Sequence, residues 1–145
     1  MIILQNTKDV GILSELKVLT ELVSLGCIVS QPYGDNAPYD FIVDINGRLI
    51  KVQVKTATEI ENGSLRIPLV KRVGSKRIGR QKYSLLDVDA VIAYSKKYEE
   101  VFFIDLHKHN ESEIFLRPKS TIKVKLNTMN IAEDFILRNI INKMF

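Results

Sequence analysis

The sequence is poor in cysteine and histidine. Its one cysteine, Cys27, lies in an apolar stretch typical of a core or edge residue, so no disulfide can form within the chain. The two histidines, His107 and His109, fall in a polar turn that we interpret as a solvated loop. No Cys and His cluster has the spacing of a zinc site. The sequence therefore excludes a disulfide scaffold and a zinc-stabilised domain.

Long apolar runs, repeats and low-complexity segments are also missing. No stretch approaches the roughly 18 apolar residues of a membrane-spanning helix, and no charged-then-apolar leader marks a signal peptide. We therefore expect no membrane association. The 145 residues, 46% hydrophobic and 26% charged, are predicted to form a single domain over residues 1–145.

Acidic residues are scarce in the centre of the chain. Residues 1–47 hold two basic and six acidic side chains, whereas residues 48–82 hold ten basic and two acidic ones. Residues 83–145 hold nine of each, so the net charge of +4 comes from the central segment. A localised excess of positive charge is the electrostatic signature of a polyanion partner.

The strongest local signal is a hairpin around Asn46 and Gly47. These residues separate two alternating, β-branched runs, Tyr39–Ile45 and Arg48–Ala57. Asn-Gly favours a type I′ turn, because both central residues of that turn need positive φ angles. A two-residue turn fixes the register, so residues whose numbers sum to 93 are expected to lie opposite each other.

The two faces of this hairpin differ in polarity. The face expected in the core carries Phe41, Val43, Ile45, Ile50 and Val52. On the other face Asp40 lies opposite Gln53, and Lys55 follows two residues further along the same side. A solvated outer face would explain this pattern, and so would a metal-and-lysine site for phosphodiester chemistry.

A helix is predicted from Lys8 to Leu25, with Asn6 or Thr7 as its cap and Gly26 as its stop. The expected core-facing stripe recurs at three- and four-residue spacing and consists of Val10, Leu13, Leu16, Leu19 or Thr20, and Val23.

Glu15 interrupts the apolar side of this helix. Its neighbours at one-turn spacing include Val18 and Leu19, so its carboxylate is partly desolvated and needs a partner. Gly11, one turn earlier, leaves room for a sheet or a ligand. The alternative is a carboxylate at the edge of the stripe that bends back to water.

A basic segment follows the hairpin near residues 64–82. After a strand candidate, Ser64–Val70, residues 71–82 contain no acid and six basic side chains: Lys71, Arg72, Lys76, Arg77, Arg80 and Lys82. Gly74 and Gly79 would act as hinges. A solvated charge run is one explanation, and contact with the phosphates of a polyanion is the one we favour.

Other elements are read from shorter patterns. The further strand candidates are Cys27–Gln31, Ala90–Tyr94, Val101–Leu106, Ile114–Leu116 and Thr121–Leu126. Of these, Ala90–Tyr94 and Val101–Leu106 are expected to form a hairpin. Ile114–Leu116 and Thr121–Leu126 are the weakest candidates. A helical pattern over residues 129–144 closes the chain.

Four polar residues stand in an order with chemical meaning: Glu15 on a helix, Asp40 on a strand, then Gln53 and Lys55 on the partner strand. Phosphodiester hydrolysis needs a divalent ion that activates water and neutralises charge on the phosphate. Mg²⁺ keeps several waters, so one or two carboxylates and a backbone carbonyl are enough to hold it. A nearby lysine can orient the water or stabilise the developing charge.

This order resembles the motif of the PD-(D/E)XK nuclease superfamily. Pro38-Tyr39-Asp40 resembles its first half, and Gln53-Val54-Lys55 resembles its second half with glutamine in place of the acid. Gly11-x-x-x-Glu15 looks like the helix element of the resolvase-like branch. The stretch from Tyr39 to Thr56 looks most like the homing endonucleases encoded in cyanobacterial group I introns.

The resemblance implies an α/β (α+β) fold in which a mixed sheet of four or five strands is flanked by helices. It also implies Mg²⁺-dependent cutting of double-stranded DNA by a homo-oligomer, a dimer or tetramer, so that both strands are cut. Such a protein is expected in the cytoplasm, associated with the nucleoid when bound to DNA.

The resemblance also implies roles for individual residues. Asp40 corresponds to the metal ligand and Lys55 to the catalytic lysine, while Glu15 and the carbonyl of Val54 are further ligands. Gln53 supplies an acceptor oxygen without charge, so metal affinity should fall. DNA contacts are expected from Lys51, Lys71, Arg72, Lys76, Arg77, Arg80 and Lys82.

Two alternatives stay open beside a sequence-specific homing enzyme. One is a structure-selective nuclease that resembles a Holliday-junction resolvase. The other is a DNA-binding module on the nuclease fold that no longer cuts, with Gln53 as the mark of lost activity. Intact Glu15, Asp40 and Lys55 favour an enzyme.

Overall fold

The structure of the chain is a computed structural model that describes residues 6–72, 79–124 and 128–144. The helices are α1 (Thr7–Ser24) and α2 (Leu137–Met144), with 3-10 helices η1 (Glu61–Gly63), η2 (Lys119–Thr121) and η3 (Ala132–Phe135). The strands are β1 (Ile28–Ser30), β2 (Phe41–Ile45), β3 (Arg48–Thr56), β4 (Thr58–Glu59), β5 (Leu65–Pro68), β6 (Val70–Arg72), β7 (Arg80–Lys82), β8 (Ala90–Ser95), β9 (Glu100–Asp105) and β10 (Glu113–Leu116). Neither α-helix has the length and hydropathy of a membrane span within the described ranges.

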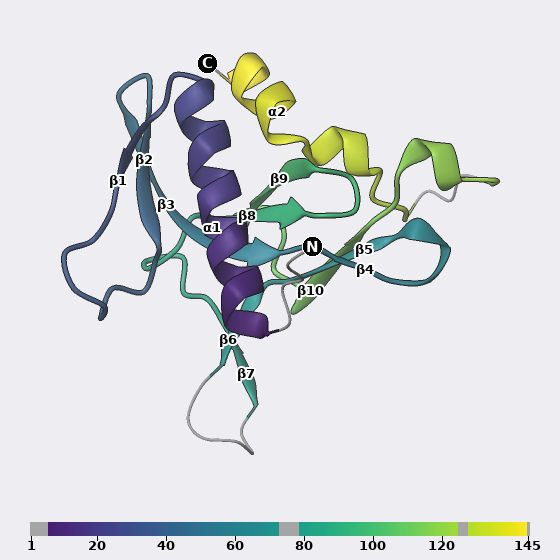
Figure 1. The fold of residues 1–145 in the computed structure, drawn as a ribbon, viewed down its shortest axis with the longest axis horizontal. Coiled ribbons are helices and arrows are strands. Elements are labelled where there is room, and N and C mark those ends of the chain that lie inside the picture. Colours follow the sequence, from purple (N-terminus) through teal and green to yellow (C-terminus); the bar gives the residue numbers. More distant parts are fainter. Residues whose placement is uncertain (1–5, 73–78, 125–127, 145) are drawn as a thin grey trace.

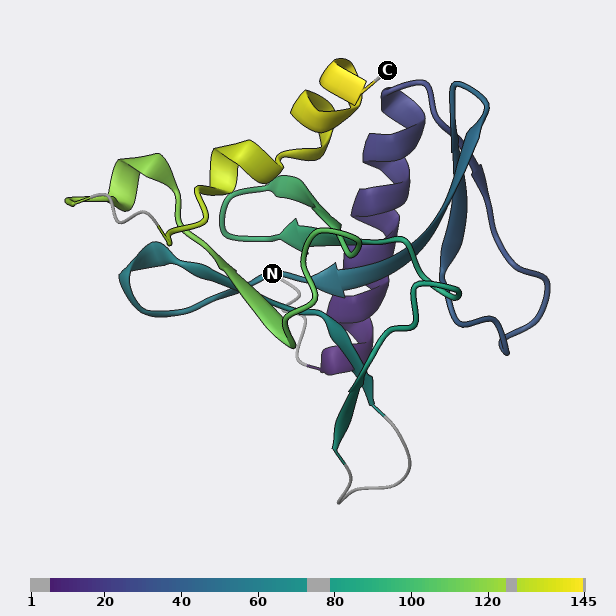
Figure 2. The same cartoon turned by 180° about the vertical axis from the view of Figure 1, so that it is seen from behind.

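A five-stranded mixed sheet forms the centre of the molecule, with strand order β1-β2-β3-β8-β9 (Figure 1). Its strands pair antiparallel except for β3 and β8, which run parallel. The helices α1 and α2 cover one face, where Val18 and Leu22 meet Val43, Val52 and other sheet residues. From behind, α1 lies beyond this sheet (Figure 2).

The opposite face of the sheet is covered by a second, three-stranded sheet of order β10-β5-β4. Leu65 and Ile67 of β5 pack there with Val91, Ala93 and Ile104 of the central sheet. Strands β6 and β7 form a separate two-stranded ribbon that projects from the body of the molecule (Figure 1). The first strand of this ribbon, β6, follows closely after β5 of the three-stranded sheet.

The central hairpin has the predicted turn and register. Asn46 and Gly47 have φ angles of 51° and 88°, as a type I′ turn requires. Phe41 pairs with Val52, and Ile45 pairs with Arg48, so the two residue numbers of every pair in the ladder sum to 93, as predicted. The five residues of the predicted apolar face are all buried: Phe41, Val43, Ile45, Ile50 and Val52.

Helix α1 begins and ends where the sequence predicts, but it buries a different face. Asn6 caps it by accepting a hydrogen bond of 2.8 Å from the N–H of Asp9. Its buried residues are Ser14, Val18 and Leu22, whereas Leu16 and Val23 are 55% and 56% exposed. The predicted core stripe is therefore wrong at Leu16 and Val23, whereas its members Leu13 and Leu19 pack at the margin of the core. The helix is apolar on two sides, and the sheet selects one of them.

The helix predicted over residues 129–144 is shorter in the structure. After η3, Ile136 is extended (φ −63°, ψ 125°) and forms a β-bridge with Phe102, so α2 begins only at Leu137. The strand predicted over 64–70 is also divided, into β5 and β6. No strand forms at residues 121–124, where η2 ends, and residues 125–127 lie outside the described part.

Candidate active site

Asp40 stands immediately before β2 and is fixed to β3 by two hydrogen bonds. Its N–H donates to the carbonyl of Val52 at 2.9 Å, which extends the hairpin pairing by one residue. Its Oδ2 accepts from the N–H of Val54 at 2.8 Å. The two halves of the sequence motif are thus joined through the Val54 backbone.

Helix α1 brings Glu15 to Asp40. The preceding residue, Ser14, is buried, and its hydroxyl lies 2.6 Å from that of Thr56 at the end of β3. This contact sets the helix against the strand, and the half-buried Glu15 carboxyl then forms a hydrogen bond with Asp40. A Cβ at Gly11 would meet no described atom within 4 Å, so the sheet does not approach that glycine closely.

The two carboxyl groups perturb each other. Burial, the charge of Asp40 and the hydrogen bond to Asp40 raise the pKa of Glu15. Burial also raises the pKa of Asp40, against the lowering effects of the Val54 N–H, Glu15 and the Lys55 charge. A pair of adjacent, partly desolvated carboxyl groups favours either a shared proton or a bound cation.

The side chain of Lys55 extends from β3 toward β6 and Tyr83. Its Nζ donates to the carbonyl of Val70 at 3.0 Å and lies 5.3 Å from the ring centroid of Tyr83. Burial and the charge of Asp40 raise the pKa of the Tyr83 hydroxyl, so this ring is a neighbour of both motif residues. Sequence reasoning missed Tyr83, although it is the first aromatic residue after the basic segment.

Gln53 lies on the same side of β3 as Lys55 and opens into a pocket of about 470 Å³. The other polar side chains of this pocket are Lys55, Arg66, Lys71, Arg80 and Tyr83. Gln53 and Lys55 are both half-buried, so this face is not the open, solvated surface that was the alternative interpretation. Arg66 is paired with Glu113 across the β5–β10 ladder.

The residues predicted to contact DNA do not all lie at this pocket. Lys71 and Arg80 line it, Lys82 is exposed on β7, and Arg72 lies in β6 opposite Arg80. Lys76 and Arg77 lie outside the described residues. Lys51 lies elsewhere: its Nζ donates to the carbonyl of Leu86, and its N–H donates to Asp89 at 2.9 Å.

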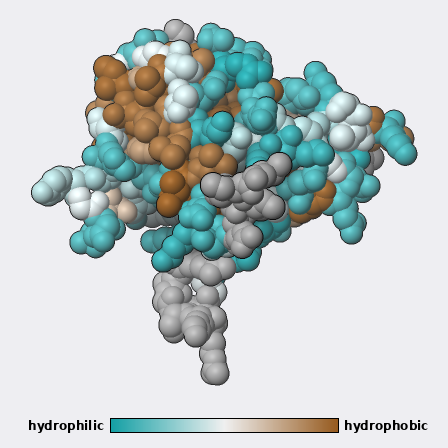
Figure 3. All heavy atoms as spheres, viewed as in Figure 1, coloured by the Kyte–Doolittle hydropathy of each residue, from teal (hydrophilic) through white to brown (hydrophobic). Residues whose placement is uncertain are grey.

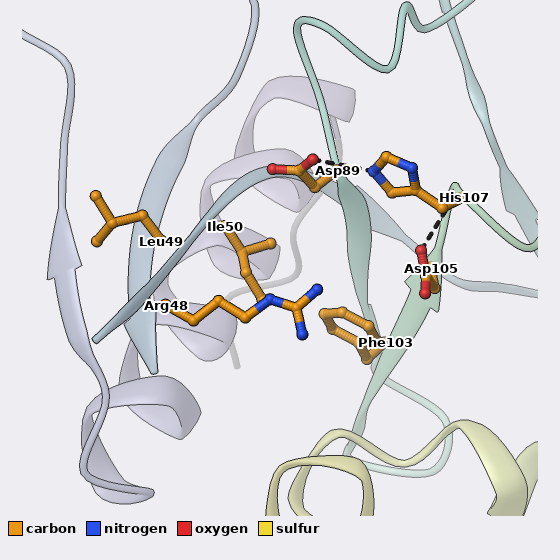
Figure 4. A pocket seen from close by; sticks show the side chains of 7 residues that line it. All are labelled: Arg48, Leu49, Ile50, Asp89, Phe103, Asp105 and His107. Carbon is orange, nitrogen blue, oxygen red and sulfur yellow. Dashed lines mark hydrogen bonds and ion pairs between the residues drawn. The ribbon is translucent and has the colours of Figure 1, made fainter. Parts of the chain in front are cut away.

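A different pocket contains no part of the motif (Figure 4); it is lined by Arg48, Leu49, Ile50, Asp89, Phe103, Asp105 and His107. Within it His107 Nε2 lies 3.1 Å from Asp89, and the N–H of His107 donates to Asp105 at 2.9 Å. His107 is half exposed, as a solvated loop predicts, whereas His109 packs against the ring of Phe135 at 5.5 Å.

The donor set at Asp40 fits a hard divalent cation with few protein ligands. No group of three or more His, Cys, Asp or Glu side chains gathers anywhere in the described part of the chain. The carboxyl groups of Glu15 and Asp40 are neighbouring ionisable oxygen donors at the motif, and Gln53, the residue before Val54 in β3, carries a neutral oxygen donor. Mg²⁺ with several retained waters accepts such a set.

Comparisons with known proteins agree with this fold. Residues 5–138 match the family model described as PD-(D/E)XK endonuclease. Among solved structures, the chain is similar to a bacterial homing endonuclease, I-Ssp6803I, with a TM-score of 0.76 and 24% sequence identity. That match covers 97% of this chain and 96% of the other. No curated protein matches the sequence. The predicted α+β nuclease fold is confirmed.

Proposed function

This chain belongs to the PD-(D/E)XK endonuclease family, and on that premise we propose that it is a sequence-specific, homing-type endonuclease that cuts double-stranded DNA with Mg²⁺. The observation that carries the proposal is the geometry of Asp40. Its carboxylate is bound to the Val54 N–H, hydrogen-bonded to Glu15 and close enough to Lys55 to feel its charge. The similarity to a homing endonuclease over nearly the whole chain supports the homing type.

Asp40 and Glu15 would hold the metal ion, with the carbonyl of Val54 as a further ligand. When bound, Mg²⁺ supplies a water of lowered pKa and a positive charge beside the scissile phosphate. The chain itself supplies oxygen donors whose positions are set by hydrogen bonds before any ligand arrives. Gln53 adds an acceptor oxygen but no charge, so the metal is held by fewer negative charges than in family members with an acid here.

Lys55 would act on the phosphate and the attacking water. Its ammonium group lies between the Val70 carbonyl and the Tyr83 ring, which fix it on the side of β3 that faces the basic pocket. A positive charge fixed in this way stabilises the charge that grows on the phosphate without reorganising during the reaction.

DNA would lie along the pocket and the projecting β6–β7 ribbon. Lys71 and Arg80 line the pocket next to Lys55, and residues 48–82 carry most of the chain's excess positive charge. Phosphate contacts at these positions would place the backbone of the duplex over the motif. Cutting both strands requires two such sites, so the working enzyme would be a homo-oligomer.

The proposal is tested by cleavage of three substrates: genomic DNA, linear duplex without a target, and a four-way junction. The purified chain is assayed with Mg²⁺, with Ca²⁺ and with EDTA, and Asp40→Ala serves as the inactive control. Mg²⁺-dependent cuts at few genomic positions would support a homing enzyme. Cutting of junctions regardless of sequence would instead indicate a resolvase-like nuclease, and binding without cutting would indicate a DNA-binding module.

A further inference from the structure

Arg66 is a basic residue of the motif pocket that the sequence pattern does not single out. It stands in β5 between Leu65 and Ile67, which are fully buried in the core on one face of the three-stranded sheet. Because side chains alternate along a strand, Arg66 lies on the other face of that sheet. Its side chain is 29% exposed and lines the same pocket as Gln53 and Lys55.

This pocket carries an unbalanced positive charge. Among the described residues, no acidic side chain lines it, whereas four cationic ones do: Lys55, Arg66, Lys71 and Arg80. Like charges gathered in one place repel one another, so the pocket favours an anion. Figure 3 shows hydrophilic surface where the β6–β7 ribbon leaves the body of the molecule, in contrast to the hydrophobic surface over α1. The surroundings of the pocket thus suit a charged ligand better than an apolar one.

A carboxylate outside the pocket holds the guanidinium group of Arg66. Its Nε donates to Oε2 of Glu113, which lies on β10 and does not line the pocket. The ion pair runs diagonally across the two paired strands, since the residue directly opposite Arg66 is Phe115. Within the described ranges, the terminal nitrogens of Arg66 meet no hydrogen-bond partner.

A guanidinium group held in this way is suited to a phosphate. Its terminal nitrogens form a planar fork that matches two phosphate oxygens. The carboxylate at Nε restricts the rotamers of the arginine, so less conformational entropy is lost when the fork binds its ligand. Glu113 therefore orients the group without occupying its terminal nitrogens.

From this geometry we propose that Arg66 binds a phosphate of duplex DNA beside the cut and that Glu113 is the positioning residue that holds it. This inference rests on the proposed function, because a duplex over the motif is what brings a phosphate to the pocket. The contact would extend the DNA surface from the β6–β7 ribbon onto the outer face of the three-stranded sheet. Since it is made to the phosphate backbone, it would add affinity without reading sequence.

The contact is tested by a charge swap, with binding of a short duplex measured in EDTA so that no cutting occurs. Arg66→Glu/Glu113→Arg keeps an ion pair and the net charge but places a carboxylate in the basic pocket. Affinity should fall by about 10-fold or more, the size of a lost charge-assisted hydrogen bond. The matched control is Arg138→Glu/Glu100→Arg, which swaps an ion pair between α2 and β9 outside the pocket and should bind normally.

Normal binding by the Arg66 swap would show that the ion pair only joins β5 to β10, and would overturn the proposal. Thermal unfolding shows whether each swapped chain is folded. If the Arg66 swap does not fold, Arg66→Gln takes its place, because glutamine can still donate to Glu113 and lacks only the charge and the fork. In that variant the slope of log K against log salt should fall by about 0.9, and an unchanged slope would contradict a phosphate contact.

The positioning role of Glu113 is tested by the direction of its effect. Removing an acid beside a polyanion site should, by charge alone, tighten binding. If Glu113 instead holds Arg66, Glu113→Ala should weaken duplex binding by about threefold or more, since Arg66 then loses rotamer freedom on binding. In an Arg66→Ala background the same substitution should not weaken binding, because no guanidinium group is left to position. Tighter binding by Glu113→Ala alone would overturn this role.

These measurements separate failure of the Arg66 contact from failure of the proposed function. Binding that depends on Arg66, with no cut when Mg²⁺ is added, would remove the nuclease proposal and leave the phosphate contact. Cutting by the unaltered chain, together with normal binding by the Arg66 swap, would do the reverse. An unaltered chain that binds no duplex would overturn both.

Discussion

Asp40 and Val54, which are fourteen residues apart in sequence, are joined by a hydrogen bond of 2.8 Å from the Val54 N–H to the Asp40 Oδ2. This bond fixes the Oδ2 oxygen of Asp40 on the backbone of β3. A ligand whose orientation is fixed by the backbone loses little entropy when it binds a metal ion. The bond would therefore preorganise Asp40 for the role of metal ligand proposed above.

Asp40→Ala should abolish cutting and leave DNA affinity within a few fold, because it would remove the proposed metal ligand and no proposed phosphate contact. The expected loss in single-turnover rate is roughly 100-fold or more. Asp35→Ala, in the exposed loop before the motif, is the matched control and should cut normally. Cutting by Asp40→Ala at near the normal rate would show that the site has been assigned to the wrong residues.

Lys55→Ala should be as inactive as Asp40→Ala, whereas Lys51→Ala should keep most of the activity. Both lysines lie on β3 and on the same side of it, but only Lys55 lines the pocket beside the motif. Lys51 instead donates to the carbonyl of Leu86, away from Asp40. Single-turnover cleavage and DNA binding are measured for both variants. Equal losses of rate and affinity would indicate that both lysines bind phosphate and that neither is catalytic.

Tyr83 is expected to position Lys55 through its ring. The ammonium group lies 5.3 Å from the ring centroid, a contact worth about 0.5–2 kcal/mol. Tyr83→Phe keeps the ring and should cut at close to the normal rate, whereas Tyr83→Leu should lose up to about 30-fold at unchanged DNA affinity. Thermal unfolding of both variants shows whether the loss is one of folding. If Tyr83→Phe loses as much as Tyr83→Leu, the hydroxyl and not the ring is the important group.

Asp89 should stabilise the fold at neutral pH. Burial acts to raise its pKa, but hydrogen bonds from the Lys51 N–H and from His107, together with the charges of those residues, lower it overall. The stabilisation is therefore present above the pKa of the unfolded chain, about 3.9, and is lost as pH falls through the lower folded value. Asp89→Asn should lose about 1–3 kcal/mol of unfolding free energy near pH 7.

The difference between Asp89→Asn and the unaltered chain should shrink as the pH falls through the lowered folded pKa of Asp89, since both side chains are neutral below it. Urea unfolding at several pH values measures this, with Asp87→Asn as the control two residues away. A difference that stays constant from neutral to acid pH would mean that packing, and not charge, accounts for the loss.

The hairpin could be predicted from sequence because its information is local. Asn46-Gly47 determines the turn, the turn determines the register, and the register places Asp40 next to Val54 and Lys55. The apolar pattern predicted the helix and drew attention to its glutamate, and the motif resemblance added the role of Glu15. These parts of the site depend on few long-range contacts, so a single sequence contained enough to place them.

Other parts depended on tertiary contacts that sequence patterns do not record. Leu16 and Val18 are both apolar residues of α1, and only packing against the sheet decides that Val18 is buried. Ile136 fits a helical pattern, yet its bridge to Phe102 in β9 delays the start of α2. Tyr83 reaches Lys55 only because β6 and β7 bring the chain back over β3.

The last prediction concerns the basic ribbon. Lys71 and Arg80 lie on paired strands and line the pocket beside Lys55, so each is placed to contact a phosphate next to the cut. Each lost phosphate contact should reduce the slope of log K against log salt by about 0.9, so Lys71→Ala/Arg80→Ala should reduce it by about 1.8. The matched control is Lys108→Ala/Lys143→Ala, which removes the same charge from a pocket beside α2. The net charge falls equally in both variants, so a smaller salt slope in the ribbon variant alone indicates direct contact with phosphate. An equal change of slope in both variants, or no change in either, would indicate that the ribbon is merely solvated.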